Sequence, residues 1–142
     1  MMLLTFVAFW EGKNDDEHGN HVPYQDVAGV WTVCYGETSV EMRVYTEIEC
    51  KAMLERRLRY FNQVVTELVT VPLNTTEQIA LTSFVYNIGE GAFRNSTLLR
   101  KLNAGDRSGA CEELRRWVFA GGKKWAGLVN RREAEQILCE GL

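Results

Sequence analysis

The sequence predicts an α+β domain that is mostly helical, with one small antiparallel sheet near the N-terminus. Residues 22–45 are rich in Val, Tyr, Trp and Thr and are broken by Pro23, Gly29 and Gly36, which is typical of short strands. From residue 46 onward, apolar residues recur at helical spacing between capping and breaking residues. A length of 142 residues with 46% hydrophobic content fits one domain with one main core.

The first ten residues, MMLLTFVAFW, predict a buried N-terminal helix. Ten residues are too few to cross a bilayer, and no small-residue cleavage site precedes the following WEGKNDDE. We therefore expect no integral membrane span and no targeting signal, so that any export route is not encoded in this chain. A truncated signal-anchor is the alternative interpretation.

A long helix is predicted from about residue 47 to residue 69. Thr46 and Glu49 form a capping box at its start, and Pro72 follows its end. Its apolar positions recur at helical spacing: Ile48, Ala52, Met53, Leu58, Phe61, Val64, Val65 and Leu68.

Shorter helices follow, and their short links predict that they pack as neighbours. Their predicted limits are Thr75 or Thr76 to Gly89, Asn95 or Ser96 to Gly105, the segment SGACEELRRWVF, and a last helix in NRREAEQILCEGL. The glycines of AGGKKWAGL interrupt this pattern and allow close approach of the backbone to a ligand or a neighbour.

The cysteines and histidines predict no metal site. The cysteines are too widely spaced for a CxxC zinc motif, and His18 and His21 have no second cluster to complete a ligand set. Four cysteines allow three disulfide connectivities, which the sequence does not distinguish, and free thiols remain an equal alternative. Proximity along the chain favours Cys34 with Cys50 and Cys111 with Cys139.

The net charge of −3 hides an uneven distribution of charge. Residues 94–132 contain 10 Lys and Arg against 3 Asp and Glu, whereas residues 1–93 contain 6 against 13. A basic segment of this kind favours association with an anionic polymer, such as nucleic acid or bacterial cell wall. Solvated cationic helix faces are the plainer explanation, and the lack of a nucleic-acid recognition motif makes nucleic acid the least favoured partner.

Eight residues separate Glu17 from Asp26 and five separate Asp26 from Thr32, a spacing that suggests a two-carboxylate site for cleaving a sugar chain. One protonated carboxyl donates a proton to the glycosidic oxygen, while the ionised one activates water or stabilises the cationic sugar. Spacing alone is weak support among 19 acidic residues, because turn-capping acids and strand threonines are common.

Three longer motifs accompany this trio: VWTVCYGET, SFVYNIGEGAFRNSTLLRKLNAGD and LRRWVFAGGKKWAGLVNRRE. Together they resemble the phage-type lysozymes, glycoside hydrolase family 24, and within that family the endolysins of lambdoid tailed phages. The resemblance extends over about residues 10–140. It implies a single lysozyme-like domain over residues 1–142, with a sheet-bearing lobe at about 15–46, the long helix at 47–69, a helical lobe at 70–142, and a cleft between the lobes.

The resemblance also implies an activity, namely hydrolysis of the β-1,4 bond between N-acetylmuramic acid and N-acetylglucosamine in peptidoglycan, for host lysis. It implies a monomer without a cofactor that is made in the host cytoplasm and acts in the periplasm or cell wall. In this family the trio inverts the anomeric carbon: Glu17 is the general acid, Asp26 orients or activates water, and Thr32 helps to hold it. Inversion requires carboxyl groups roughly 6.5–9.5 Å apart.

Substrate contacts implied by the resemblance all have structural alternatives, such as helix capping or a tight turn. They are Asn87, Ser96, Thr97, Gly121 and Gly122. Arg131 and Arg132 are candidates for binding acidic peptide stems, or for pairing with Glu133 and Glu135 as weak surface ion pairs.

One departure from the family pattern concerns the acid. The family's glutamate usually precedes glycine, whereas Glu17 precedes His18, and Glu11 precedes Gly12. The interval to Asp26 favours Glu17, which we expect at the end of the first helix, desolvated by aromatic side chains.

Two other functions remain open. A wall-binding module without catalysis would keep the fold alone, but the intact trio argues against it. A lytic transglycosylase uses one acid and releases an anhydro product, and the retention of Asp26 and Thr32 disfavours it. Product mass separates the two reactions, because hydrolysis adds water.

Overall fold

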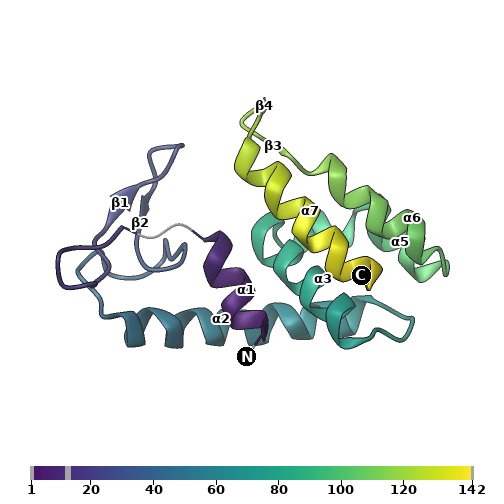
Figure 1. The fold of residues 1–142 in the computed structure, drawn as a ribbon, viewed down its shortest axis with the longest axis horizontal. Helices are drawn as coiled ribbons and strands as arrows, with labels where there is room; N and C mark the ends of the chain where they lie inside the picture. Colours follow the sequence, from purple (N-terminus) through teal and green to yellow (C-terminus); the bar gives the residue numbers. More distant parts are fainter. Residues whose placement is uncertain (1, 12–13, 142) are drawn as a thin grey trace. The chain divides into compact units, whose positions relative to one another are not determined.

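The computed structural model describes residues 2–11 and 14–141 and divides into two compact units, Met1–Leu58 and Arg59–Leu142. Figure 1 follows the chain from the N-terminal helix through the strands of the first unit to the helices of the second. None of the helices in the described ranges is both long enough and apolar enough to cross a membrane.

The first unit begins with α1 (Met2–Trp10), so the predicted N-terminal helix is confirmed. The expectation that this helix is buried is largely wrong. Only Val7 is fully enclosed, whereas Phe9 is 77% exposed. The apolar residues on every face of this helix led to the expectation of burial. A helix of nine residues can nevertheless bury one stripe of side chains and leave the others exposed.

The predicted sheet is smaller than the composition suggested. It consists of β1 (Tyr24–Gln25) and β2 (Trp31–Thr32), paired antiparallel with Tyr24 opposite Thr32. Beyond these strands the same region forms only isolated bridges, including one from His21 to Tyr45. Turns take up the remaining residues, as the glycines of this region require.

The long helix α2 (Glu47–Leu68) confirms the predicted element almost to the residue. Thr46 and Glu49 form the predicted capping box, with the Glu49 amide donating to the Thr46 hydroxyl and the Thr46 amide donating to the Glu49 carboxylate. A buried stripe follows the helix at spacings of three and four residues, as helical periodicity requires. Its innermost members are Cys50, Leu54, Leu58 and Val65.

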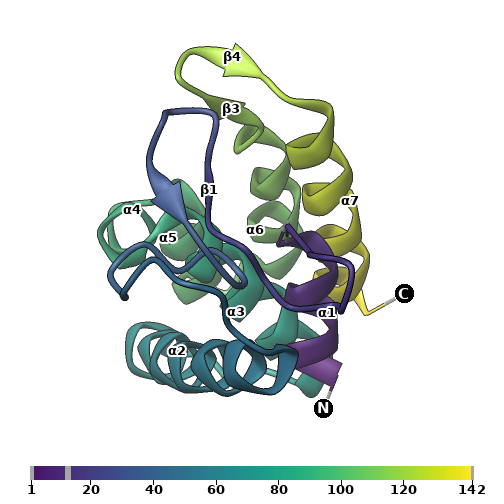
Figure 2. The ribbon, with the colours of Figure 1, turned by 90° about the vertical axis from the view of Figure 1, so that its left-hand side faces the viewer.

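The second unit is built from helices and one short hairpin. Its elements are α3 (Thr75–Ile88), α4 (Glu90–Arg94), α5 (Thr97–Asn103), α6 (Arg107–Glu113), the 3₁₀ helix η1 (Leu114–Arg116), β3 (Phe119–Ala120), β4 (Lys123–Lys124) and α7 (Ala126–Glu140). Figure 2 shows β3 and β4 as a two-stranded ribbon that leads into α7. The glycine-rich stretch, expected to interrupt the helices and to allow close approach of the backbone, forms the turn of a hairpin.

Helix α3 lies at the centre of the second unit. Every residue from 79 to 86 is buried, and its principal partner is α7. Phe84 contacts the rings of Phe93 and Trp117 edge to face, with centroids 6.3 and 5.5 Å apart. The predicted stop at Gly89 is confirmed by its φ of 95°, but the N-cap is Asn74 rather than a threonine.

Both favoured disulfides are present, Cys34 with Cys50 and Cys111 with Cys139. The first closes a loop within the first unit and ties the turn after β2 to the first turn of α2. The second joins α6 to the end of α7, and both of its cysteines belong to the main core of the second unit.

Most of the basic residues in segment 94–132 are paired with acids. The pairs are Arg94 with Glu90, Lys101 and Arg116 with Glu113, Arg107 with Glu77, and both Arg131 and Arg132 with Glu135. The positive charge of this segment is thus balanced in part by carboxylates from several helices.

Candidate active site

Asp26 occupies a tight turn between β1 and β2, and the turn fixes the direction of its carboxylate. Its Oδ1 accepts hydrogen bonds from the amides of Ala28 and Val30, both at 2.9 Å. The amide of Asp26 donates to the Val30 carbonyl at 2.9 Å, and Gly29 has a φ of 79°, which only glycine adopts readily. The turn-like signal in the sequence was therefore correct, and the turn presents an exposed carboxylate in a defined orientation.

Thr32 lies on the other strand of the same hairpin, opposite Tyr24. Its side chain is buried, and its hydroxyl donates to the Val30 carbonyl at 2.9 Å. Because the hydroxyl proton is engaged, the Oγ1 lone pairs remain to accept hydrogen bonds. The hairpin thus brings two of the three expected catalytic residues into one short element.

Glu17 lies on an exposed turn between the bridged residues Asp15 and His21. Asp16 shapes this turn, because its carboxylate accepts hydrogen bonds from the amides of His18 and Asn20 at 2.9 Å. The Glu17 side chain is 86% exposed, and its Oε1 lies 3.5 Å from Nε2 of His18. The expectation that Glu17 ends the first helix and is desolvated by aromatic rings is wrong, because α1 ends at Trp10.

Glu11 directly follows α1, and its amide donates to the Val7 carbonyl at 3.0 Å. Burial raises the pKa of the Tyr24 phenol, and the negative charges of Glu11 and Asp26 raise that pKa further. The half-buried Glu11 therefore lies within electrostatic reach of the residue that is paired with Thr32.

Asn87 is exposed at the end of α3, and its Oδ1 accepts a hydrogen bond from the guanidinium of Arg132. Arg131 and Arg132 are almost fully buried and share the Glu135 carboxylate, with N–O distances of 3.3 and 2.5 Å. The Ser83 hydroxyl also donates to that carboxylate, at 2.6 Å. The expectation of weak surface ion pairs is therefore wrong: this is an interior network that fixes the carbonyl end of the Asn87 amide.

The other expected substrate contacts have structural uses. Ser96 is buried and caps α5, accepting from the Leu99 amide at 3.0 Å and donating to the Phe93 carbonyl at 2.7 Å. Thr97 is exposed, and its hydroxyl accepts from Arg100 at 2.8 Å. Gly121 and Gly122 form the exposed turn between β3 and β4, with φ values of 61° and 76°.

Reasoning from the sequence missed the burial of the paired Arg131, Arg132 and Glu135 and the place of Tyr24 near two carboxylates. The sequence does indicate that Arg131 and Arg132 can pair with Glu135, since residues three and four positions apart lie side by side on a helix. The sequence does not reveal that α7 turns these charges inward, because that orientation depends on the packing against α3. Tyr24 carried no signal beyond its strand composition.

Known proteins match most of this chain. The phage lysozyme family model matches residues 15–135, a range that includes Glu17, Asp26 and Thr32 and excludes Glu11. A SAR-endolysin of bacteriophage PS119 is 50% identical over 132 residues, covering 90% of this chain and 79% of the relative. A SAR-endolysin of Escherichia phage Mu is 49% identical over 120 residues, covering 83% and 70% of the two chains.

Solved structures agree with these matches. An endolysin from the Escherichia coli O157:H7 phage FAHEc1 has a TM-score of 0.83 at 30% identity, covering 96% of this chain and 89% of that one. The muramidase domain of SpmX from Asticaccaulis excentricus has a TM-score of 0.82 at 28% identity, covering 97% and 94%. The α+β architecture, the hairpin motif around Asp26 and these matches lead to one conclusion: the chain belongs to the phage lysozyme family.

Proposed function

We propose that this chain is an endolysin of the muramidase type, which hydrolyses the β-1,4 bond between N-acetylmuramic acid and N-acetylglucosamine in bacterial peptidoglycan. One observation carries the proposal: within the region matched by the family, a turn orients the Asp26 carboxylate beside the strand that holds Thr32. Family membership supplies the reaction class, that of a lysozyme-type glycoside hydrolase, and the hairpin supplies groups suited to it.

The hydrogen bonds of the hairpin suggest how a water molecule is activated. Two backbone amides hold Oδ1 of Asp26, so that Oδ2 is the oxygen aimed at a water proton. Thr32 donates its own proton to the Val30 carbonyl, so its oxygen accepts the second hydrogen of the same water. With both hydrogens held, the lone pair of the water attacks the anomeric carbon.

Glu17 is the proposed general acid. Its carboxyl proton passes to the glycosidic oxygen of the leaving sugar as the bond breaks, and the proton of the attacking water passes to Asp26. Attack from the face opposite the leaving group inverts the anomeric carbon, a mechanism that requires a separation of roughly 6.5–9.5 Å between the two carboxyl groups. The reducing end of the first product is then the α anomer, which NMR detects before mutarotation.

Glu11 is the alternative acid, and one observation favours it: its charge acts on Tyr24 together with that of Asp26. Glu17, by contrast, is exposed on its turn, with a side chain that is 86% accessible to solvent. The interval to Asp26 and the limits of the family match favour Glu17. Replacing each glutamate separately and comparing the activities distinguishes the two assignments of the acid.

The test is a turbidity assay on outer-membrane-permeabilised cells. Glu17→Gln is expected to reduce lysis about 10²- to 10⁴-fold, the usual contribution of a general acid, while Glu11→Gln stays within a few-fold of the parent. Asp26→Asn keeps an oxygen for the two amides but removes the charge, and should also abolish lysis. The reverse ranking of the two glutamate variants, both folded, would transfer the acid role to Glu11, and an anhydro product by mass spectrometry would replace hydrolysis with transglycosylation.

The cellular setting is part of the same proposal. The relatives are named SAR-endolysins, and we infer that this protein is made in the host cytoplasm and acts as a monomer on the cell wall to lyse the host. Its polymer partner is peptidoglycan rather than nucleic acid. Light scattering at working concentrations, with and without soluble wall fragments, tests the monomer.

A further inference from the structure

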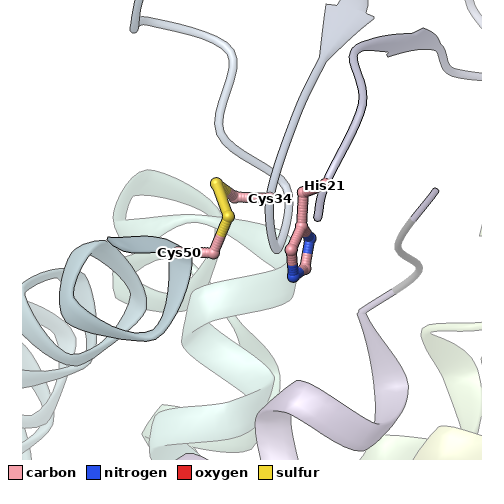
Figure 3. Close-up of side chains that lie close together, drawn as sticks. All are labelled: His21, Cys34 and Cys50. Atoms are coloured by element: carbon pink, nitrogen blue, oxygen red, sulfur yellow. A yellow bond between two sulfur atoms is a disulfide. The ribbon is translucent and has the colours of Figure 1, made fainter. Parts of the chain in front are cut away.

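A buried histidine lies beside the disulfide of the first unit. His21 is fully enclosed, and one of its ring nitrogens and the sulfur atoms of Cys34 and Cys50 lie within 4.8 Å of one another. Figure 3 shows the imidazole next to the two sulfurs. This is the one group of three such side chains among the described residues that stands close enough to hold a metal ion.

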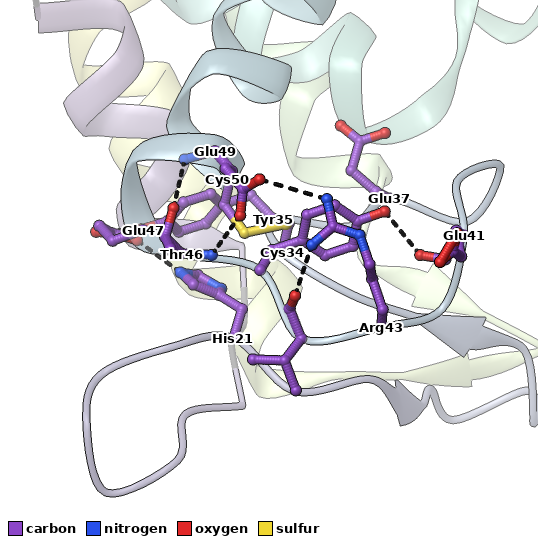
Figure 4. Close-up of a disulfide and its surroundings, with 12 residues drawn as sticks. His21, Cys34, Tyr35, Glu37, Glu41, Arg43, Thr46, Glu47, Glu49 and Cys50 are labelled. Carbon is purple, nitrogen blue, oxygen red and sulfur yellow. Dashed lines mark hydrogen bonds and ion pairs between the residues drawn. A yellow bond between two sulfur atoms is a disulfide. The ribbon is translucent and has the colours of Figure 1, made fainter.

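The two ring nitrogens of His21 differ in their surroundings. Nε2 lies 2.6 Å from Oε1 of Glu47, whose carboxylate also accepts from the Tyr35 hydroxyl at 2.8 Å (Figure 4). Nδ1 is buried and has no hydrogen-bond partner among the described residues. When Nε2–H donates to Glu47, Nδ1 retains a lone pair with nothing to bind.

This arrangement matches the way in which proteins prepare a histidine ligand. A metal-binding imidazole almost always donates its other N–H to a carboxylate, which fixes the tautomer and increases the basicity of the ring. Two thiolates and one imidazole are ligands that suit Zn²⁺. Here a carboxylate partner on one ring nitrogen and two sulfur atoms beside the ring are already in place.

The three side chains are also held by separate backbone elements. His21 pairs with Tyr45 through two backbone hydrogen bonds of 2.8 and 3.0 Å, and Cys50 lies in the first turn of α2. Cys34 lies in a tight turn closed by reciprocal bonds between Val33 and Glu37, both 2.9 Å. Reduction of the disulfide therefore leaves its two cysteines close together, on elements that other bonds maintain.

We propose that the reduced form of this protein binds one Zn²⁺ ion through the thiolates of Cys34 and Cys50 and a ring nitrogen of His21. A dithiol reductant supplies two electrons and two protons, so that the S–S bond breaks, two thiols form and the reductant becomes a disulfide. Zn²⁺ then displaces the two thiol protons into solvent and binds the thiolates and the neutral imidazole, with water in the fourth position. In the oxidised form the sulfur atoms are bonded to each other and no thiolate is available.

The proposed ion would replace the disulfide as a cross-link. In a reducing compartment the metal ties the turn after β2 to the start of α2, which the disulfide does after oxidation. This inference is independent of the proposed catalytic reaction, because none of its ligands is among the proposed catalytic residues. The other disulfide offers a matched control, since Cys111 and Cys139 belong to no such three-ligand group within residues 2–11 and 14–141.

Cobalt and zinc titrations of the full chain test the proposal. The protein is reduced with a phosphine, freed of reductant without oxygen, and titrated with Co²⁺ while sulfur-to-cobalt charge-transfer absorption is recorded. We expect one Co²⁺ per chain, displaced by Zn²⁺, in the reduced parent and in Cys111→Ser/Cys139→Ser, and no such band in the oxidised parent or in reduced Cys34→Ser/Cys50→Ser. Equal binding by the Cys34→Ser/Cys50→Ser variant, or no binding by the reduced parent, would overturn the proposal.

His21 requires its own test, because it is buried and its replacement can impair folding. His21→Gln is expected to weaken Co²⁺ binding by at least about 10-fold, and affinity equal to that of the parent removes His21 from the ligand set. A measurement on the unmutated chain does not depend on that variant. Co²⁺ should shift the ring signals of His21 strongly in NMR spectra, with those of the exposed His18 as the internal reference, and unshifted His21 signals refute the ligand assignment.

Discussion

The disulfide between Cys111 and Cys139 offers the most quantitative prediction. It joins α6 to the end of α7, and both cysteines are buried in the core of the second unit. We consider its reduction in a chain where Cys34 and Cys50 are both replaced by alanine. Reduction breaks the remaining S–S bond without removing any heavy atom, so the effect of the cross-link is separated from the loss of side-chain packing.

The expected size of the effect follows from the length of chain that the bond closes. The two cysteines are 28 residues apart, and the chain-entropy relation for such a loop gives about 3.6 kcal/mol of stability at 25 °C. The same relation gives about 3.1 kcal/mol for Cys34 and Cys50, which are 16 residues apart. The larger loop should therefore contribute about 0.5 kcal/mol more to stability.

The assay is urea unfolding followed by tryptophan fluorescence, because Trp117 and Trp125 both lie in the second unit. With a slope of about 1–3 kcal/mol per molar urea, reduction should lower the midpoint by at least about 1 M. Mass spectrometry of alkylated peptides confirms that the bond has been broken. A midpoint shift below about 0.3 M after complete reduction would refute the reasoning, since it would mean that the bond does not constrain the unfolded chain.

Three further changes have defined outcomes. Glu135→Gln should reduce the free energy of unfolding by about 3–5 kcal/mol, because it removes the negative charge that pairs with two buried guanidinium groups. The control, Glu133→Gln at an exposed position, should change that free energy little. Urea unfolding measures both. Ser96→Ala should cost about 1 kcal/mol through the lost cap of α5, with Thr97→Ala as the exposed control in thermal unfolding. Backbone hydrogen bonds lower the pKa of Asp16 in the folded protein, so its contribution to stability is present above its unfolded pKa and is lost as the pH falls through the folded value. Asp16→Asn should therefore flatten the acid limb of the stability curve below about pH 4, and an unchanged limb would contradict this.

The helices were predictable where local signals determine them. The capping box at Thr46 and the long apolar periodicity located α2, and Ser96 and Gly89 marked a start and a stop correctly. Elements that depend on pairing between distant residues were less predictable. Strand-forming residues from 22 to 45 mostly form turns, because only two positions on each strand find ladder partners.

The candidate site was likewise predictable only where its geometry depends on residues that are close together in the sequence. Asp26 and Thr32 lie on one hairpin, so their spacing along the chain determines how close they are. The environment of Glu17 was predicted wrongly, because it depends on where α1 ends and on the hydrogen bonds that Asp16 makes in the following turn. Burial of Arg131 and Arg132 was missed because charge pattern along a helix does not state which face meets the core.

The ion pairs of segment 94–132 also affect the long-range electrostatic attraction between the protein and the cell wall. Six of its ten basic side chains, those of Arg94, Lys101, Arg107, Arg116, Arg131 and Arg132, pair with carboxylates, so part of the positive charge of the segment is balanced locally. Long-range attraction to an anionic polymer requires unscreened charge of one sign. The rate of association with the cell wall should therefore depend only weakly on ionic strength, and the protein should elute early from a cation exchanger despite its arginine-rich helices.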